Sequence, residues 1–257
     1  MFLVFNKQKI ITYFVSFFTV IVLFFVASTI NDNSKTVETL SVNERLLPIY
    51  NVKTDEEKVA FTMNCAWNGD DIDSILETLK NNDVKITFFM VGEWIDKYPE
   101  AVKKIYEAGH EIANHSDTHK HVNNSSYEEN VQEIKNANEK IKNITGVENK
   151  LYRAPYGEYN NTVIKAANEN GYIPIQWNLD TLDYTGITGE EMWNRIKGKI
   201  KKGDIILSHN GTKNTANSLD MLIKNIKKEG FDIVRVSDLI YKDNYRIDIN
   251  GTQTKNK

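Results

Sequence analysis

Two histidines in the middle of the chain, His115 and His119, are spaced for binding one metal ion. They follow a short apolar segment, and residues four apart on a helical turn share one face, so both imidazoles could reach the same ion. His110 and His121 lie close by in the sequence, and a solvated histidine-rich stretch without a metal fits the spacing equally well. The other segments of the chain decide between the two interpretations.

Three further segments carry functional side chains at the ends of predicted strands. They are Arg153–Gly157, the pair Asp180 and Asp183, and Leu207–His209. The carboxyl ends of parallel strands meet at one edge of a sheet, where the catalytic residues of such folds are found. We therefore expect these segments to converge with the histidine pair and to form the site of a metal-dependent hydrolase.

Between residues 58 and 241 the chain alternates between short β-rich apolar runs and longer helical patterns. This alternation is typical of βαβ units around a parallel sheet. The predicted strands are 59–63, 85–91, 111–114, 151–154, 173–177, 204–208 and 231–236. The pattern predicts an α/β fold, a (β/α) barrel of about seven parallel strands. A doubly wound open sheet shows the same alternation and is the alternative.

The helical patterns between these strands have clear apolar stripes and start signals. The stripes are Ile72, Ile75, Leu76 and Leu79 in the first helix, and Leu219, Leu222, Ile223 and Ile226 in a late one. Side chains at this spacing lie on one helix face, which we expect to pack on the sheet. Ser126 with Glu129, and Thr188 with Glu191, have the spacing of capping boxes and predict two helix starts.

The N-terminal segment differs from the rest of the chain. Lys7 and Lys9 precede an almost uninterrupted apolar run over residues 10–30. This run is long enough to span a bilayer, which takes ~20 residues. Lysines before the run and polar residues after it predict a transmembrane anchor with the N-terminus in the cytoplasm and the remainder extracytoplasmic. The small residues at 26–29 leave a cleaved signal segment, and hence secretion, as the alternative.

Composition sets further bounds. The net charge is -3, from 32 basic and 35 acidic side chains, so nucleic acid is not an expected partner. Cys65 is the only cysteine, which excludes an intrachain disulfide. We expect a cytoplasmic N-terminus and anchor at 1–30, a stalk with a lead-in strand at 31–57, one folded domain at 58–241, and a loose polar tail at 242–257.

Taken in order, the segments resemble the motifs of polysaccharide deacetylases of the NodB-homology type, and most of all the membrane-anchored sporulation branch of that family. The resemblance rests on His115–His119, Arg153–Gly157, Asp180–Tyr184 and Leu207–His209, and on the lead-in segment 47–58. It implies a distorted (β/α) barrel that removes acetyl groups from N-acetylated amino sugars of a glycan. An envelope location makes peptidoglycan the nearest substrate.

The resemblance also implies roles for single residues. His115 and His119 would bind the metal, a divalent ion expected to be zinc, which polarises the acetamide carbonyl and activates a water. The backbone N–H of Tyr156 would help to stabilise the oxyanion. His209 would be the general acid that protonates the leaving amine, with Asp183 fixing its tautomer.

Four more residues receive roles in the same way. Leu207 and Tyr184 would line the acetyl pocket, although Leu207 could be an ordinary core residue and Tyr184 stands where the family usually has tryptophan. Pro155 lies beside Tyr156 in the substrate-binding motif. Arg153 would pair with the carboxylate that acts as general base, unless it is a surface cation.

The chain departs from the family at that base. The first motif of the family ends in two aspartates, a base and a metal ligand, whereas this chain has Asn64 and Cys65. An amide cannot accept a proton from water at neutral pH, so Asn64 can orient a water molecule but cannot act as the base.

Three outcomes follow from this departure. The chain could be a slow deacetylase in which His209, Asp70 or Asp71 replaces the base. It could be an inactive glycan-binding protein of the envelope with a role in sporulation. Cys65 could also join the two histidines as a zinc ligand, the alternative being a small buried apolar side chain.

Overall fold

The computed structural model describes residues 17–21, which are helical, and residues 45–256. The chain divides into a unit of residues Met1–Glu44 and a compact unit of residues Arg45–Lys257. Within the described residues, no helix is long and apolar enough to cross a membrane. The predicted span at 10–30 lies, apart from residues 17–21, outside the described part of the chain.

Each of the seven predicted strands is present. They are β2 (Lys58–Cys65), β3 (Thr87–Met90), β4 (Glu111–Asn114), β5 (Leu151–Tyr152), β6 (Ile173–Pro174), β8 (Ile205–His209) and β9 (Asp232–Val234). An eighth, β7 (Leu179–Asp180), was not predicted. The strand order is β6-β5-β4-β3-β2-β8-β7, β9 pairs with β2, and every pairing in this sheet is parallel.

The sheet curls into a half-barrel. Neighbouring strands follow chain order from β2 to β6, which is the order of a barrel-type sheet and not that of the doubly wound alternative. The lead-in segment contacts the β6 edge of the sheet and the residues before β8. Ile49 N–H donates to the Pro174 carbonyl at 2.9 Å, and the Ile49 carbonyl accepts from Gln176 N–H at 2.7 Å. On the other side, Val52 N–H donates to the Gly203 carbonyl at 2.8 Å. The expected barrel is therefore confirmed as a curled parallel half-barrel.

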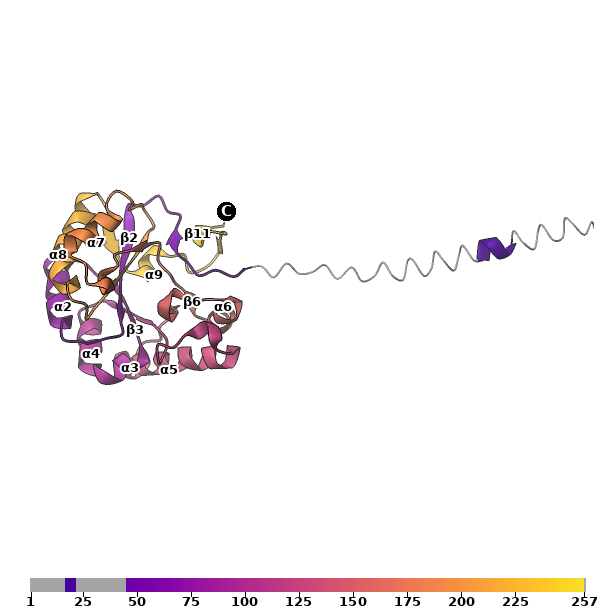
Figure 1. Cartoon of the computed structure of the whole chain (residues 1–257), viewed down its shortest axis with the longest axis horizontal. Helices are drawn as coiled ribbons and strands as arrows, with labels where there is room; N and C mark the ends of the chain where they lie inside the picture. The colour runs from indigo at the N-terminus through magenta and orange to yellow at the C-terminus, as the bar shows by residue number, and fades with distance from the viewer. Residues whose placement is uncertain (1–16, 22–44, 257) are drawn as a thin grey trace, which may run out of the picture. The chain divides into compact units, whose positions relative to one another are not determined.

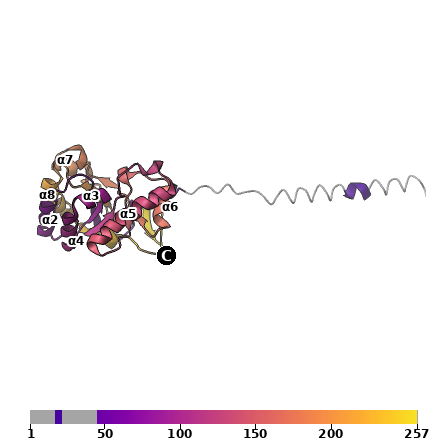
Figure 2. The ribbon, with the colours of Figure 1, turned by 90° about the horizontal axis from the view of Figure 1, so that it is seen from below.

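Helices cover the outside of this sheet. They are α2 (Ile72–Asn81), α3 (Gly92–Lys97), α4 (Pro99–Glu107), α5 (Tyr127–Thr145), α6 (Asn161–Asn168), α7 (Gly189–Ile196) and α8 (Thr215–Lys228). The short helix α9 (Val236–Leu239) packs instead with Ala60 and Phe89, on the inner face of the sheet. Helices α2 and α8 lie side by side in both views of the chain (Figures 1 and 2). Both predicted capping boxes are present, at the starts of α5 and α7.

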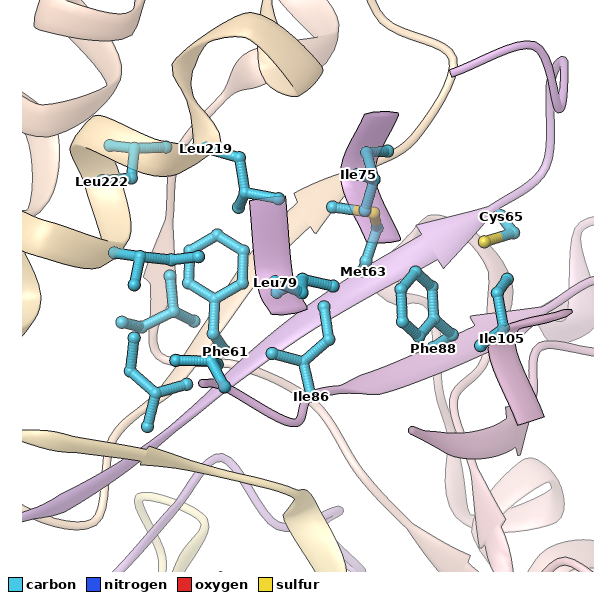
Figure 3. Packing of buried hydrophobic residues seen from close by; sticks show 14 of the residues in the cluster. Phe61, Met63, Cys65, Ile75, Leu79, Ile86, Phe88, Ile105, Leu219 and Leu222 are labelled. Carbon is cyan, nitrogen blue, oxygen red and sulfur yellow. The ribbon is translucent and has the colours of Figure 1, made fainter. Parts of the chain in front are cut away.

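Strand β2 separates an apolar core from the functional site. Its residues Phe61, Met63 and Cys65 belong to the large buried cluster that also contains the apolar stripes of α2 and α8 (Figure 3). Alternate residues of a strand point to opposite faces, so Thr62 and Asn64 face the inside of the half-barrel. Both bond there to a buried arginine, described below. One strand therefore supplies the core on one face and the site on the other.

The C-terminal segment is not the loose tail that its polar composition predicted. Strand β11 (Thr252–Lys255) pairs in parallel with β1 (Asn51–Val52) and antiparallel with β10 (Tyr245–Ile247). Gln253 is fully buried and bonds to both backbone polar groups of Tyr241, at 2.9 Å and 2.7 Å. The prediction was wrong because polar side chains here are satisfied by hydrogen bonds, which composition does not reveal.

A buried histidine away from the site makes stability depend on pH. His110 packs on Phe88, its Nδ1 accepts the Ile86 N–H at 3.2 Å, and burial, with the positive charges of Lys85 and Arg235, lowers the pKa of His110 to about 4. In the unfolded chain the imidazole of His110 is protonated below about pH 6.5, whereas in the folded chain it stays neutral down to about pH 4. The free energy of unfolding therefore falls by about 3 kcal/mol as the pH is lowered from 6.5 towards 4.

We expect His110→Asn, whose amide oxygen can accept the same N–H, to remove this part of the pH dependence. Denaturant unfolding at several pH values between 7 and 4 measures it. The parent should lose more stability than the variant over this range, whereas parallel curves would assign the dependence to other groups.

Candidate active site

The candidate residues converge at the carboxyl ends of the strands. Asn64 and His209 are register partners on the neighbouring strands β2 and β8. His115 directly follows β4, and Arg153 directly follows β5. The edge predicted from the sequence therefore carries an amide, a guanidinium and two imidazole groups.

The rings of His115 and His119 lie edge to face, with centroids 5.0 Å apart and an interplanar angle of 74°. The segment between them is not the helical turn that the spacing predicted. Ser116 has φ 70° and His119 has φ 54°, and the intervening peptide groups bond to α3 and α5 instead of to one another. A loop of unusual backbone conformation therefore brings the two rings together.

Both imidazoles are held in the neutral state that metal binding requires. Burial, followed by the nearby His119, lowers the pKa of His115 well below its ordinary value. The pKa of His119 is lowered by burial and by His209. His115 Nδ1 lies 2.8 Å from the Arg153 carbonyl oxygen, to which it donates, so its Nε2 carries the free lone pair.

Two neutral imidazoles fit a zinc ion, although as an incomplete ligand set. Among the described residues, no group of three or more His, Cys, Asp or Glu side chains is arranged to hold a metal. A catalytic zinc site usually has three protein ligands. His115 and His119 could thus hold an ion whose other positions are taken by water or substrate.

Cys65 does not complete the set. Its thiol lies in the apolar cluster with Met63 and Phe88 (Figure 3), on the strand face opposite to Asn64. Burial, and to a smaller extent Asp71, raises the pKa of the thiol well above its ordinary value, which opposes the thiolate that zinc binds. The zinc-ligand interpretation of Cys65 was therefore wrong, and the alternative of a small buried apolar side chain agrees with its position.

We expect Cys65→Ala to leave zinc affinity within about twofold of the parent and to lower stability by about 1 kcal/mol, as loss of a small buried group does. Chelator competition and denaturant unfolding measure the two effects. His115→Ala serves as the control that should abolish binding. A loss of zinc affinity of tenfold or more in the cysteine variant would restore the ligand interpretation.

Arg153 is the fully buried cation at the centre of the site, not a surface cation. Its Nη1 donates to Asn64 Oδ1 at 2.9 Å and to Thr62 Oγ1 at 3.0 Å, and its Nη2 donates to the Gln176 carbonyl at 3.0 Å. Its Nε has no partner, and the guanidinium lies 3.9 Å from the centre of the Phe89 ring. Burial lowers the pKa of Arg153 to about 9, as expected for a buried cation whose nearest acceptors are neutral.

His209 and Asp183 form a pair joined by two hydrogen bonds. His209 Nδ1 lies 2.8 Å from Asp183 Oδ1, and the His209 backbone N–H donates to Asp183 Oδ2 at 2.6 Å. Thr215 Oγ1 donates to the same oxygen at 2.7 Å. Asp183 is fully buried, and because its carboxylate accepts from Nδ1, it leaves Nε2 of His209 as the nitrogen that can exchange a proton with substrate.

The aspartates proposed to replace the base are placed differently. Asp71 accepts hydrogen bonds from Asn210 Nδ2 at 3.1 Å and from Gly211 N–H at 2.7 Å, so it holds the loop that follows His209. Asp70 is exposed on the preceding turn. Asp71 is therefore a structural acceptor for the loop that begins with Asn210 and Gly211.

Aromatic side chains surround the site. Tyr156, at φ 57°, stacks on His121 with ring centroids 4.3 Å apart and lies 4.6 Å from the ring of His119. Tyr184 and Trp67 lie 5.3 Å and 5.2 Å from the ring of His209. All three are about half exposed, which suits contact with sugar rings.

Two other residues of the acetyl-pocket and substrate-binding predictions are buried. Leu207 lies on the same face of β8 as His209, two residues before it, and Pro155 begins the short 3-10 turn that contains Tyr156. Sequence reasoning gave no role to Trp67. An aromatic residue two positions after the end of a site-bearing strand was the available signal.

Comparison with known proteins identifies the class. The family model for polysaccharide deacetylase matches residues 51–175. The chain is 30% identical over 192 residues to the peptidoglycan-N-acetylglucosamine deacetylase of Bacillus cereus, covering 72% of this chain and 69% of that protein. The chain belongs to the polysaccharide deacetylase family, a family of hydrolases.

More similar in sequence is the uncharacterized protein YlxY of Bacillus subtilis, 34% identical over 193 residues, which are 75% of this chain but only 60% of YlxY. The crystal structure of BA3943, a CE4 family pseudoenzyme from Bacillus anthracis, superposes with a TM-score of 0.72 at 30% identity, covering 80% of this chain and 72% of that one. A mutant of BA3943 with restored enzymatic activity superposes with the same TM-score of 0.72.

Proposed function

We propose that this chain is an impaired deacetylase of N-acetylated amino sugars in a cell-envelope glycan, with peptidoglycan as the first substrate to test. The observation that carries the proposal is the contrast between two halves of the site. The acid pair of His209 and Asp183 is complete, whereas the position of the base holds Asn64, bonded to Arg153.

Each residue then has a defined task. Zinc held by His115 and His119 would supply Lewis-acid polarisation of the acetamide carbonyl. His209 protonates the leaving amine, and Asp183 keeps its ring in the required tautomer and orientation. The Tyr156 N–H, Leu207, Tyr184 and Pro155 bind the acetyl group and the sugar around it.

The missing step is removal of a proton from the attacking water. The Oδ1 atom of Asn64 already accepts from Arg153, and the amide nitrogen can only donate. Loss of a general base costs typically ~10²- to 10⁴-fold in rate. Slow hydrolysis with His209 serving first as base and then as acid fits within this range.

A glycan-binding protein without turnover is the second candidate. It is favoured by the similarity to BA3943, which is called a pseudoenzyme. The aromatic groups Tyr156, Tyr184 and Trp67 would serve binding equally well in either case.

The proposed location is the outer side of the membrane, with residues 10–30 as the anchor or, if cleaved, as a secretion signal. The basis is Lys7 and Lys9 before the apolar run. Because the chain resembles the membrane-anchored sporulation branch of the family, we propose that the protein acts in the envelope of a sporulating cell.

Acetate release tests the proposed activity. The purified full-length chain, supplied with zinc, is incubated with N-acetylglucosamine oligomers and with peptidoglycan, and His209→Ala is the matched control. Slow release by the parent that is lost in His209→Ala supports the enzyme. Binding of the oligomers without acetate release would favour the second candidate, and neither binding nor release would contradict both.

A further inference from the structure

The loop between the two histidines is held from both sides. On one side, the start of α3 donates to its carbonyls: Gly92 N–H to Ser116 O and Glu93 N–H to Asp117 O, each at 2.9 Å. Ser116 N–H donates to Asn114 Oδ1 at 2.8 Å. These bonds fix the carbonyl side of a loop whose first residue has the left-handed φ of 70°, a conformation that non-glycine residues adopt rarely.

On the other side lies one carboxylate, that of Glu133 on α5. Its Oε2 accepts from Ser116 Oγ at 2.6 Å, from Asp117 N–H at 3.0 Å and from Thr118 N–H at 2.9 Å. Its Oε1 accepts from Thr118 Oγ1 at 3.0 Å and lies 3.3 Å from Lys120 Nζ. Every residue between the two histidines thus donates to this one side chain.

Glu133 is nearly buried, with 7% of its surface exposed, so its acceptors face the loop and not bulk water. Burial acts to raise the pKa of Glu133, but the hydrogen bonds from Ser116 and Thr118 outweigh it, and the net shift is downward. The side chain is therefore ionised at neutral pH. A carboxylate is the chemically suitable group, because four donors converge on it and it can only accept.

We propose that Glu133 is the positioning residue for the metal-binding histidines. It makes none of the hydrogen bonds of the two imidazoles and acts through the loop, by holding the loop backbone in the conformation that places the two rings edge to face with centroids 5.0 Å apart. The inference rests on the proposed metal binding by His115 and His119.

Glu133→Gln is the sharpest test. Glutamine keeps the size of the side chain but replaces one acceptor oxygen by an NH₂ donor, which would face the hydroxyl and amide donors of the loop. Substitution of a group that orients metal ligands typically weakens metal binding ~10- to 100-fold. We expect a loss of zinc affinity of that size, measured by chelator competition on the full-length chain.

Asn130→Ala is the matched control. Asn130 is also buried on α5, and its Nδ2 donates to the carbonyls of Val122, Ser125 and Ser126, which belong to the neighbouring loop and not to the histidine loop. Asn130→Ala should lower the melting temperature of the metal-free protein about as much as Glu133→Gln does. Its zinc affinity, however, should stay within about twofold of that of the parent. A merely structural role of Glu133 would make the two variants behave alike.

The outcomes separate this inference from the proposed function. If the parent binds zinc and Glu133→Gln binds it equally well, Glu133 does not position the ligands and the inference is wrong. If the parent itself binds no zinc, the proposed metal site fails first and the inference falls with it. Should Glu133→Gln fail to fold, Ser116→Ala removes only the 2.6 Å bond and should still weaken zinc binding severalfold; unchanged affinity there would equally overturn the inference.

Discussion

Asn64→Asp is expected to raise kcat/KM for acetate release by about 10²- to 10⁴-fold, the contribution of one general base. The new carboxylate would occupy the position where Asn64 Oδ1 now lies 2.9 Å from Arg153 Nη1. The buried guanidinium would stabilise its ionised form, which is the form that takes a proton from water. The measurement is the initial rate of acetate release from N-acetylglucosamine oligomers, parent and variant side by side.

A second consequence of the same change is thermodynamic. Arg153 is buried beside neutral acceptors, and burial holds its pKa at about 9. A neighbouring carboxylate would raise that pKa again and make Asn64→Asp at least as stable as the parent. Asn64→Ala is the control for loss of the side chain. This variant should show no increase in rate, and it should be less stable than both the parent and Asn64→Asp. A rate for Asn64→Asp no higher than that of the parent would mean that another part of the site is defective.

Asp183→Asn, made in the Asn64→Asp background, is expected to lower kcat by about 10²- to 10⁴-fold, the range for loss of a general acid. Asp183 accepts three hydrogen bonds, from His209 N–H, His209 Nδ1 and Thr215 Oγ1. An amide offers only one acceptor oxygen and brings a donor against these groups, so the imidazole loses both its orientation and its tautomer. The kcat is measured with the acetate assay at saturating substrate.

Asp204→Asn is the matched control for burying an amide in place of a carboxylate. Asp204 is buried just before β8, where it accepts from Asn178 and Lys201, and it lies at the opposite end of the strand from His209. Its substitution should cost stability but keep kcat within a few fold. Equal losses of kcat in Asp183→Asn and Asp204→Asn would show that the loss comes from lower stability of the fold and not from a changed His209.

The elements that position the site could be predicted because their signals are local. A buried parallel strand is a short apolar run, and a capping box needs only Ser126 and Glu129, so periodicity and spacing sufficed. The convergence of Asn64, Arg153 and His209 also followed, since the carboxyl ends of parallel strands share one edge.

Other features depend on contacts distant in the sequence. The geometry of His115 and His119 is set by hydrogen bonds to α3 and to Glu133, and spacing alone suggested a helical turn instead. Whether the side chain of Cys65 points into the site or into the apolar core depends on the register of its strand, because a shift by one residue would turn it to the other face. Strand β11 is polar, and only its pairing with β1 shows that it is part of the fold.

The natural site has Asn64 where a proton acceptor is needed, and it offers two histidines where catalytic zinc usually has three protein ligands; we hold that the missing proton acceptor is what limits the rate. The most direct test is to measure initial rates of acetate release over a range of oligomer concentrations for the parent and Asn64→Asp, so that kcat and KM are separated. We expect the two proteins to differ in kcat, with KM values within about threefold of each other, because both make the same contacts with substrate. Equal kcat values, or a difference confined to KM, would contradict it.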